Sequence, residues 1–152
     1  MRMHLFILPL LLPITLQAQK GEAAIKTDLK ALAAHFQESA RFDLDRDDRL
    51  VVDLFSKGQH VRRDMVPLVH LDTSAIAFNE EEQLVLLRCS AEQGQCIDKE
   101  VLKTGAISRT GRCGIPVPAG DVRGEKAVAL LRQLVRDGLA AMPPKETGNK
   151  RR

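Results

Sequence analysis

The chain has few aromatic residues. Its 152 residues include no tryptophan, no tyrosine and five phenylalanines. Sites for carbohydrates and for single-stranded nucleic acids rely on aromatic side chains that stack against the ligand. The composition therefore argues against both classes, and the core must be built from leucine, valine, isoleucine and alanine.

The motifs of several enzyme classes are also missing. The sequence has no glycine-rich phosphate loop, no His-Glu-x-x-His, no Gly-x-Ser-x-Gly and no Ser-x-x-Lys. Three cysteines, spaced Cys-x6-Cys-x16-Cys and distant from His60 and His70, do not match the ligand pairs of a zinc site. We therefore expect no cofactor, no metal site and no catalytic residue of these known patterns.

The charge is small and unevenly placed. The formal net charge is +3, but Lys145, Lys150, Arg151 and Arg152 gather at the C-terminal end. The rest of the chain is close to neutral. A nucleic-acid-binding protein needs a basic face to neutralise phosphates. We expect no nucleic acid among the partners.

The first 18 residues have the layout of a secretory signal peptide. Arg2 gives a positive start, residues 5–16 are mostly apolar, and Ala18 offers a small residue at the cleavage position. The apolar run is shorter than the roughly 20 residues that cross a membrane, and Pro9 and Pro13 interrupt it. We expect export, cleavage after Ala18 and a soluble protein without a membrane span, in the periplasm or outside the cell.

Two helices are predicted near the ends of the exported chain. The first has an apolar stripe at helical spacing, formed by Ile25, Leu29, Leu32 and Phe36. The second has a stripe formed by Val128, Leu131, Leu134, Val135 and Leu139. Asp121 is a suitable N-cap for the second helix, and prolines end it after Met142. His35 lies beside the first stripe, where a solvated or hydrogen-bonded side chain is expected.

The segment between the helices is predicted to be β-structure. Strands are expected at residues 41–45, 49–55, 60–68, 75–78, 83–89, 96–102 and 112–117. Polar turns separate several of these runs, which favours sequential hairpins. The apolar run 84–87 is typical of a strand covered on both faces, so we expect it at the centre of the sheet. Residues 96–102 are expected to pair with it across the loop 90–95.

The predicted fold class is α+β. It comprises an N-terminal helix, a mainly antiparallel meander of six to seven strands and a C-terminal amphipathic helix packed on the sheet. By element order alone this resembles the pleckstrin-homology-like arrangement. Residues 19–142 form one domain, and the polar tail 143–152 is predicted to be disordered.

Cys89 and Cys96 are predicted to form a disulfide. They lie at the ends of two predicted strands, and oxidation is the expected fate of such a pair in an exported protein. Cys113 is then left over. A small buried side chain is the simplest interpretation, and an intermolecular bridge or a reactive thiol are the alternatives.

An acidic turn offers a second functional alternative. Asp43, Asp45 and Asp47 match the first three ligand positions of a calcium loop. However, Asp48 stands where that loop needs glycine, and Leu54 stands where it needs a bidentate acid. A hairpin turn with a solvated acidic tip explains the same residues without a metal.

The arrangement also resembles small exported proteins of Gram-negative bacteria with no assigned activity. The residues that carry the resemblance are Ala18-Gln19, the run 84–87, Cys89, Gly94 and Cys96-Ile97. It implies no catalytic residue. We expect a non-enzymatic exported module that binds another exported protein or a small ligand. A thiol enzyme using Cys113 and a calcium-stabilised structural protein are the alternatives.

Overall fold

A computed structural model describes residues 14–143, with side chains from Gln19 onward. The chain begins with α1 (Ile14–Phe36) and closes with α2 (Glu125–Ala141). Between the helices lie β1 (Ala40–Leu44), β2 (Arg49–Ser56), β3 (Gln59–Pro67), the short 3-10 helices η1 (Leu68–His70) and η2 (Thr73–Ala75), β4 (Ala77–Asn79), β5 (Leu84–Arg88), β6 (Ile97–Val101), β7 (Ala106–Thr110) and β8 (Arg112–Pro116). This order confirms the α+β class.

The strands form two antiparallel sheets. The larger has five strands in the order β1-β2-β3-β6-β7, and the smaller has three in the order β4-β5-β8. Only Gly111 separates β7 from β8, so the chain passes there from one sheet into the other. The mainly antiparallel pairing agrees with the sequence prediction, and the division into two sheets is new.

The predicted pairing of residues 84–87 with 96–102 is wrong. β5 pairs with β4 and β8, whereas β6 pairs with β3 and β7. The loop 90–95 carries the chain from one sheet to the other and does not close a hairpin. β5 is therefore the centre of the smaller sheet only. The described residues contain eight strands, one more than predicted. The unpredicted strand is β7, which is almost wholly exposed and therefore lacks an apolar pattern in the sequence.

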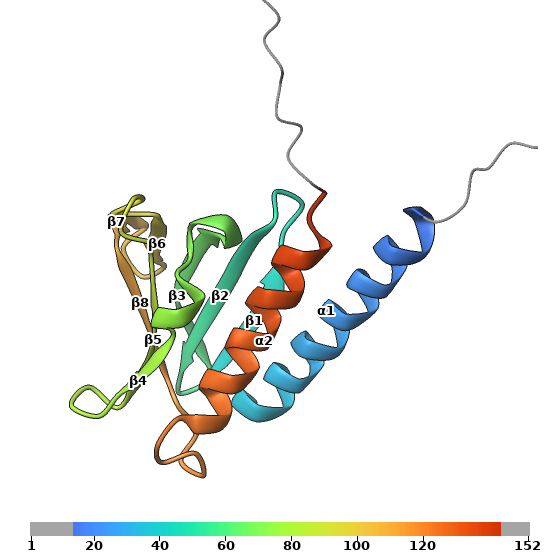
Figure 1. Ribbon diagram of the computed structural model, residues 1–152. Coiled ribbons are helices and arrows are strands. Elements are labelled where there is room, and N and C mark those ends of the chain that lie inside the picture. Colours follow the sequence, from blue (N-terminus) through green and yellow to red (C-terminus); the bar gives the residue numbers. More distant parts are fainter. Residues whose placement is uncertain (1–13, 144–152) are drawn as a thin grey trace, which may run out of the picture.

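The two helices run antiparallel, side by side (Figure 1). A Cβ atom added to Gly21 would lie 2.9 Å from the Cβ of Ala141, so the start of α1 approaches the end of α2 closely. The predicted apolar stripe of α2 is confirmed, with Leu131, Leu134 and Val135 fully buried. In α1, Leu32 and Phe36 are buried, and the earlier part of the stripe is partly covered.

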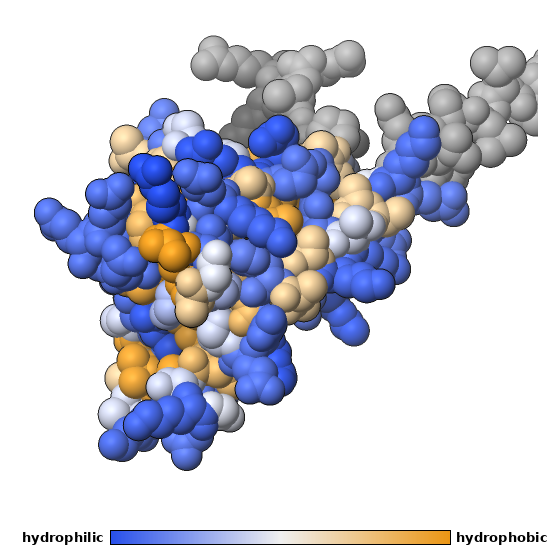
Figure 2. Space-filling model, turned by 90° about the horizontal axis from the view of Figure 1, so that it is seen from below, coloured by the Kyte–Doolittle hydropathy of each residue, from blue (hydrophilic) through white to orange (hydrophobic). Residues whose placement is uncertain are grey.

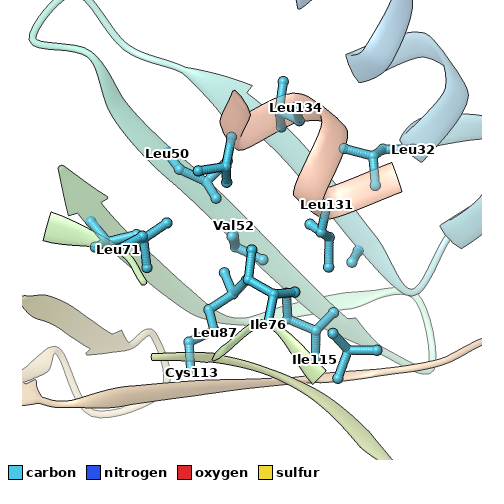
Figure 3. Packing of buried hydrophobic residues seen from close by; sticks show 14 of the residues in the cluster. Leu32, Leu50, Val52, Leu71, Ile76, Leu87, Cys113, Ile115, Leu131 and Leu134 are labelled. Atoms are coloured by element: carbon cyan, nitrogen blue, oxygen red, sulfur yellow. The ribbon is translucent and has the colours of Figure 1, made fainter. Parts of the chain in front are cut away.

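The core lies between the helices and the inner faces of both sheets (Figure 3). β2 alternates regularly, with Leu50, Val52 and Leu54 turned inward. The smaller sheet contributes Leu87 and Ile115 from the other side. Aliphatic side chains make up most of this cluster, as the composition requires.

The predicted signal peptide and the predicted disordered tail fall largely outside the described residues. The helix α1 begins at Ile14 and thus runs through the predicted cleavage position after Ala18. Within residues 14–143 no helix is long and apolar enough to cross a membrane.

Candidate functional site

An open groove lies where α2 ends beside the turn between β1 and β2. Its volume is about 620 Å³. Its lining comprises Pro67, Val69, Leu139, Met142 and Pro143, together with Asp47 and Asp48. Val69 is 45% exposed, although η1, which carries it, also places Leu68 in the core. The groove thus combines an apolar lining with carboxylates from the β1–β2 turn.

The acidic turn of the groove is held together by one of its own residues. The Asp45 carboxylate accepts hydrogen bonds from the backbone N–H of Asp47 at 2.9 Å and of Arg49 at 3.0 Å. It also accepts one from Nε of Arg49 at 2.8 Å. Burial raises the pKa of Asp45, but these hydrogen bonds outweigh it and leave the pKa lowered. Asp45 therefore organises the turn, and Asp47 and Asp48 are left at its tip.

The same contacts weaken the calcium interpretation. Asp45 is committed to the turn and to Arg49, and Asp43 accepts a hydrogen bond from the N–H of Leu44. Among residues 14–143 no group of three or more histidine, cysteine or acidic side chains is arranged to hold a metal ion. Asp43, Asp45 and Asp47 are thus not brought together as a ligand set.

A second hollow lies at the other end of the helix pair. It has a volume of about 550 Å³ and is bordered by His35, Asp121 and Lys126, among others. Nε2 of His35 lies 3.0 Å from Oδ2 of Asp121. The same carboxylate accepts from the N–H of Ala127 at 2.8 Å, although Gly124 is the N-cap residue of α2. Asp121 therefore caps the helix from a distance, and His35 is hydrogen-bonded as expected.

Cys89 and Cys96 form a disulfide. The pairing predicted from the sequence is confirmed, but its place in the fold differs. The N–H of Cys89 donates to the carbonyl of Gly111 at 3.0 Å, and Leu71 forms an isolated bridge with Cys89. The disulfide thus joins the end of β5 to the residue before β6, at the corner between the two sheets.

Cys113 is fully buried on β8, beside two charged residues of β3. Asp64 is only 1% exposed, and its Oδ2 lies 2.9 Å from Nη2 of Arg62. The same Nη2 donates to the carbonyl of Gly114 at 2.7 Å and so ties the larger sheet to the smaller one. This cluster joins the sheets inside the protein.

The environment of Cys113 is opposite to that of a nucleophilic thiol. Burial, and then the negative charge of Asp64, raise its pKa well above the ordinary value. His60 stacks on Phe55, and its Nε2 lies 2.9 Å from Oδ1 of Asp53. Both partners are on the outward face of β2. No histidine is among the groups that shift the pKa of Cys113.

The face seen in Figure 2 is mostly hydrophilic, with hydrophobic residues in small separate groups. Single exposed apolar side chains are ordinary in proteins of this kind. The groove could not be predicted from the sequence, because its lining comes from the β1–β2 turn, the end of β3, η1 and the end of α2. Only its acidic tip forms a local pattern.

Comparison of the chain with protein-family models, with curated proteins and with solved structures finds no match. The resemblances to small exported proteins and to the pleckstrin-homology-like arrangement stay predictions.

Proposed function

We propose that this chain is an exported, non-enzymatic binding module that holds a peptide segment of another exported protein in the groove beside Asp47 and Asp48. Two observations support export. The first 18 residues have the layout of a signal peptide, and Cys89 and Cys96 form a disulfide, which is typical of oxidising compartments.

The proposal that the chain binds a peptide rests on the features of the groove. Its lining is mainly apolar, and Val69 remains 45% exposed in it. Asp47 is 81% exposed at the rim, and Arg49 approaches it only to 3.9 Å. Asp48 has no ion pair among the described residues. An occupant that places an apolar side chain on the lining and a lysine or arginine at the rim satisfies both features.

Two other occupants fit the groove less well. Residues 145–152 of the chain are basic but contain no apolar side chain to cover the lining. The most exposed apolar side chains that a second copy offers are Ile107 and Val122, which lie on separate segments, and separate exposed apolar side chains are ordinary on a surface. A partner segment with both apolar and basic residues matches the groove better.

The alternatives named from the sequence gain no support from these contacts. A thiol enzyme needs an accessible cysteine with a lowered pKa, and Cys113 is buried with a raised pKa. A calcium site needs several free carboxylates, and Asp45 is engaged with Arg49.

The test is a titration of the purified protein with a short labelled peptide in which leucine and lysine alternate. A peptide with glutamate in place of lysine is the comparison, and fluorescence anisotropy reports binding. We expect the lysine peptide to bind at least about tenfold more tightly. Asp47→Asn with Asp48→Asn should abolish this preference. Asparagine suits position 48, where φ is 55°.

Control variants distinguish binding in the groove from general electrostatic attraction between the peptide and the protein. Glu81→Gln with Glu92→Gln removes two exposed carboxylates outside the groove and should leave the preference unchanged. Val69→Asn should weaken the lysine peptide by at least about tenfold, because it places a polar amide on the apolar lining without adding a charge. Equal affinity for both peptides, or indifference to Val69→Asn, would overturn the proposed site. Removal of residues 144–152 should not strengthen binding, and a large gain would identify the tail as the occupant.

Export is tested by a separate measurement. The intact mass of the protein recovered from its native compartment should correspond to a chain that begins at Gln19 and lacks the two hydrogens lost on forming the disulfide. A cytosolic protein with the full N-terminus would contradict export and leave the peptide experiment unaffected.

A further inference from the structure

The larger sheet ends in a strand whose outer edge is open. β7 is the last strand in the order β1-β2-β3-β6-β7 and lies on the side of the molecule away from the helices (Figure 1). Four of its five residues are exposed, and Ile107 is 68% exposed. An open strand edge presents unpaired N–H and C=O groups, to which another strand can hydrogen-bond.

Two hydrogen bonds show which backbone groups of β6 are directed toward β7. The N–H of Leu102, the residue after β6, donates to the carbonyl of Val61 at 3.1 Å, so Leu102 is turned toward β3. Backbone groups alternate in direction along a strand, which turns those of Val101 toward β7. The N–H of Gly105, before β7, accordingly donates to the carbonyl of Val101 at 2.9 Å. Every second residue of β6, counted back from Val101, therefore faces β7.

The same alternation directs the backbone groups of Ile107 and Arg109 to the open edge. Ala106, Ser108 and Thr110 are in register with the residues of β6 that face β7, so their N–H and C=O groups are used within the sheet. Ile107 and Arg109 lie between them and point the other way. Among the described residues neither has a backbone hydrogen bond outside the pairing of β7 with β6. Each therefore offers one N–H and one C=O to a further strand.

The other sheet edges are protected, whereas that of β7 is not. Proteins protect strand edges with a covering element, with very short strands, or with proline, lysine or a β-bulge. β1 packs against α1, and β4 has only three residues. β8 ends at Pro116, and the carbonyl of its Gly114 already accepts from Arg62 at 2.7 Å. β7 contains neither proline nor lysine, and its register with β6 has no shift.

We propose that the open edge of β7 pairs with the same edge of a second copy of the chain, which joins two five-stranded sheets into one of ten strands. The two strands run antiparallel about a two-fold axis at Ser108. Ile107 of each copy then lies opposite Arg109 of the other, and each such pair exchanges two hydrogen bonds. A register with Ile107 opposite itself would pair Arg109 with Gly105, whose N–H is already engaged with Val101. This inference goes beyond the proposed peptide binding and does not depend on it.

The side chains beside the edge are complementary in this register. Nε of Arg109 lies 3.0 Å from Oδ1 of Asp98, and Ile107 is in register with Glu100, so these four side chains share one face of the sheet. In the dimer the aliphatic part of each Arg109 covers the exposed Ile107 of the other copy. The carboxylates of Asp98 and Glu100 on β6 balance the two arginines, and no like charges stand directly opposite each other.

The test is sedimentation equilibrium of the purified protein. One short strand gives a small interface, so we expect a dimer that dissociates on dilution, with a dissociation constant on the order of 0.1 mM. Ile107→Lys should raise this constant at least about tenfold, because each lysine then stands opposite Arg109 of the other copy. The same lysine faces Glu100 within its own chain, so the monomer stays folded, which circular dichroism checks. Val122→Lys is the matched control, because Val122 is 71% exposed outside the sheets, and should leave the constant unchanged.

A second pair of variants tests the register. Ser108→Cys places a thiol on the two-fold axis, where opposite Cβ atoms are about 4.5–5.5 Å apart, so oxidation by air should link the two copies by a disulfide. Ile107→Cys lies opposite Arg109 and should cross-link at least about tenfold more slowly.

Three outcomes would overturn the proposal. The first is a monomer at every concentration up to about ten times the expected dissociation constant. The second is a dimer that is indifferent to Ile107→Lys and is not cross-linked by Ser108→Cys, because it would form through another surface. The third is a dimer that appears only after removal of residues 144–152, which would identify the tail as the occupant of the edge.

Discussion

At Gly124 both the backbone conformation and the packing require glycine. It precedes α2 with φ of 63°, in the left-handed region that favours glycine. A Cβ atom added there would lie 2.6 Å from Cδ2 of Phe78. The absence of a side chain at this position lets α2 start against β4.

Gly124→Ala should therefore lower the free energy of unfolding by about 2 kcal/mol, from left-handed strain and the displacement of Phe78. Urea unfolding followed by circular dichroism measures the change. Gly120→Ala is the matched control, because Gly120 is exposed and has no atom within 4 Å of an added Cβ. A loss of the same size in both variants would contradict this explanation.

Cys113 gives a second prediction at the scale of single residues. Its full burial and raised pKa make the native thiol unreactive. Native protein should resist iodoacetamide at pH 8 and take up one equivalent after unfolding in urea, as measured by intact mass. Rapid labelling of the native protein would show that the β8 strand opens easily and would revive the thiol-enzyme alternative.

Among the elements, the corner between the two sheets depends most on covalent support. β5 and β6 are not hydrogen-bonded to each other, so no hairpin pairing holds the loop 90–95 between them. The disulfide holds this crossing, and the N–H of Ser90 donates to the carbonyl of His70 at 2.8 Å beside it.

Replacing both Cys89 and Cys96 by serine should destabilise the protein by about 2.5 kcal/mol, which is the loop-closure value for an eight-residue ring. Equilibrium unfolding in urea measures the loss. Reduction of the unmodified protein should give a loss of similar size, because it opens the same ring. If both treatments leave stability unchanged, the corner is held by its hydrogen bonds alone.

Over the whole molecule, two kinds of carboxyl group set the dependence of stability on pH. For Asp121, burial raises the pKa, but hydrogen bonds from Ala127 and His35 outweigh it and leave the pKa lowered. For Asp53, burial is likewise outweighed by Arg63 and His60. Stability from these groups is present above the ordinary aspartate pKa and is lost as the pH falls below it. The contribution of Asp28 to stability has the opposite dependence on pH, because burial and the neighbouring Asp137 raise its pKa to about 6. It is present in acid and is lost as the pH rises through about 6.

The free energy of unfolding should therefore rise from pH 2.5 to about 4 and then fall by about 1 kcal/mol up to pH 7, after allowance for partial exposure of Asp28. Urea titrations across this range test the profile. In Asp28→Asn the decline above pH 4 should disappear, while the rise at lower pH stays. A profile of the same shape in both proteins would assign the decline to other groups.

Local patterns in the sequence were sufficient for much of this fold. The apolar stripes predicted the two helices, and the short runs between polar turns predicted most strands. The spacing of Cys89 and Cys96 predicted their disulfide. These features depend on neighbours within a few positions, where side-chain periodicity reports directly on the buried face. One local signal was missed: Asp28 interrupts the apolar stripe of Ile25, Leu29 and Leu32, which indicates a carboxyl group close to the buried face of the helix.

Nearby residues in the chain encode the α+β class, the helices, the disulfide pair and the acidic turn. The tertiary structure is needed to know which strands share a sheet and what surrounds Cys113 and Asp28. It alone also assembled the groove from the β1–β2 turn, η1 and the end of α2. These features depend on contacts between residues far apart in the chain, and they arise only when the helices and both sheets bury a common core.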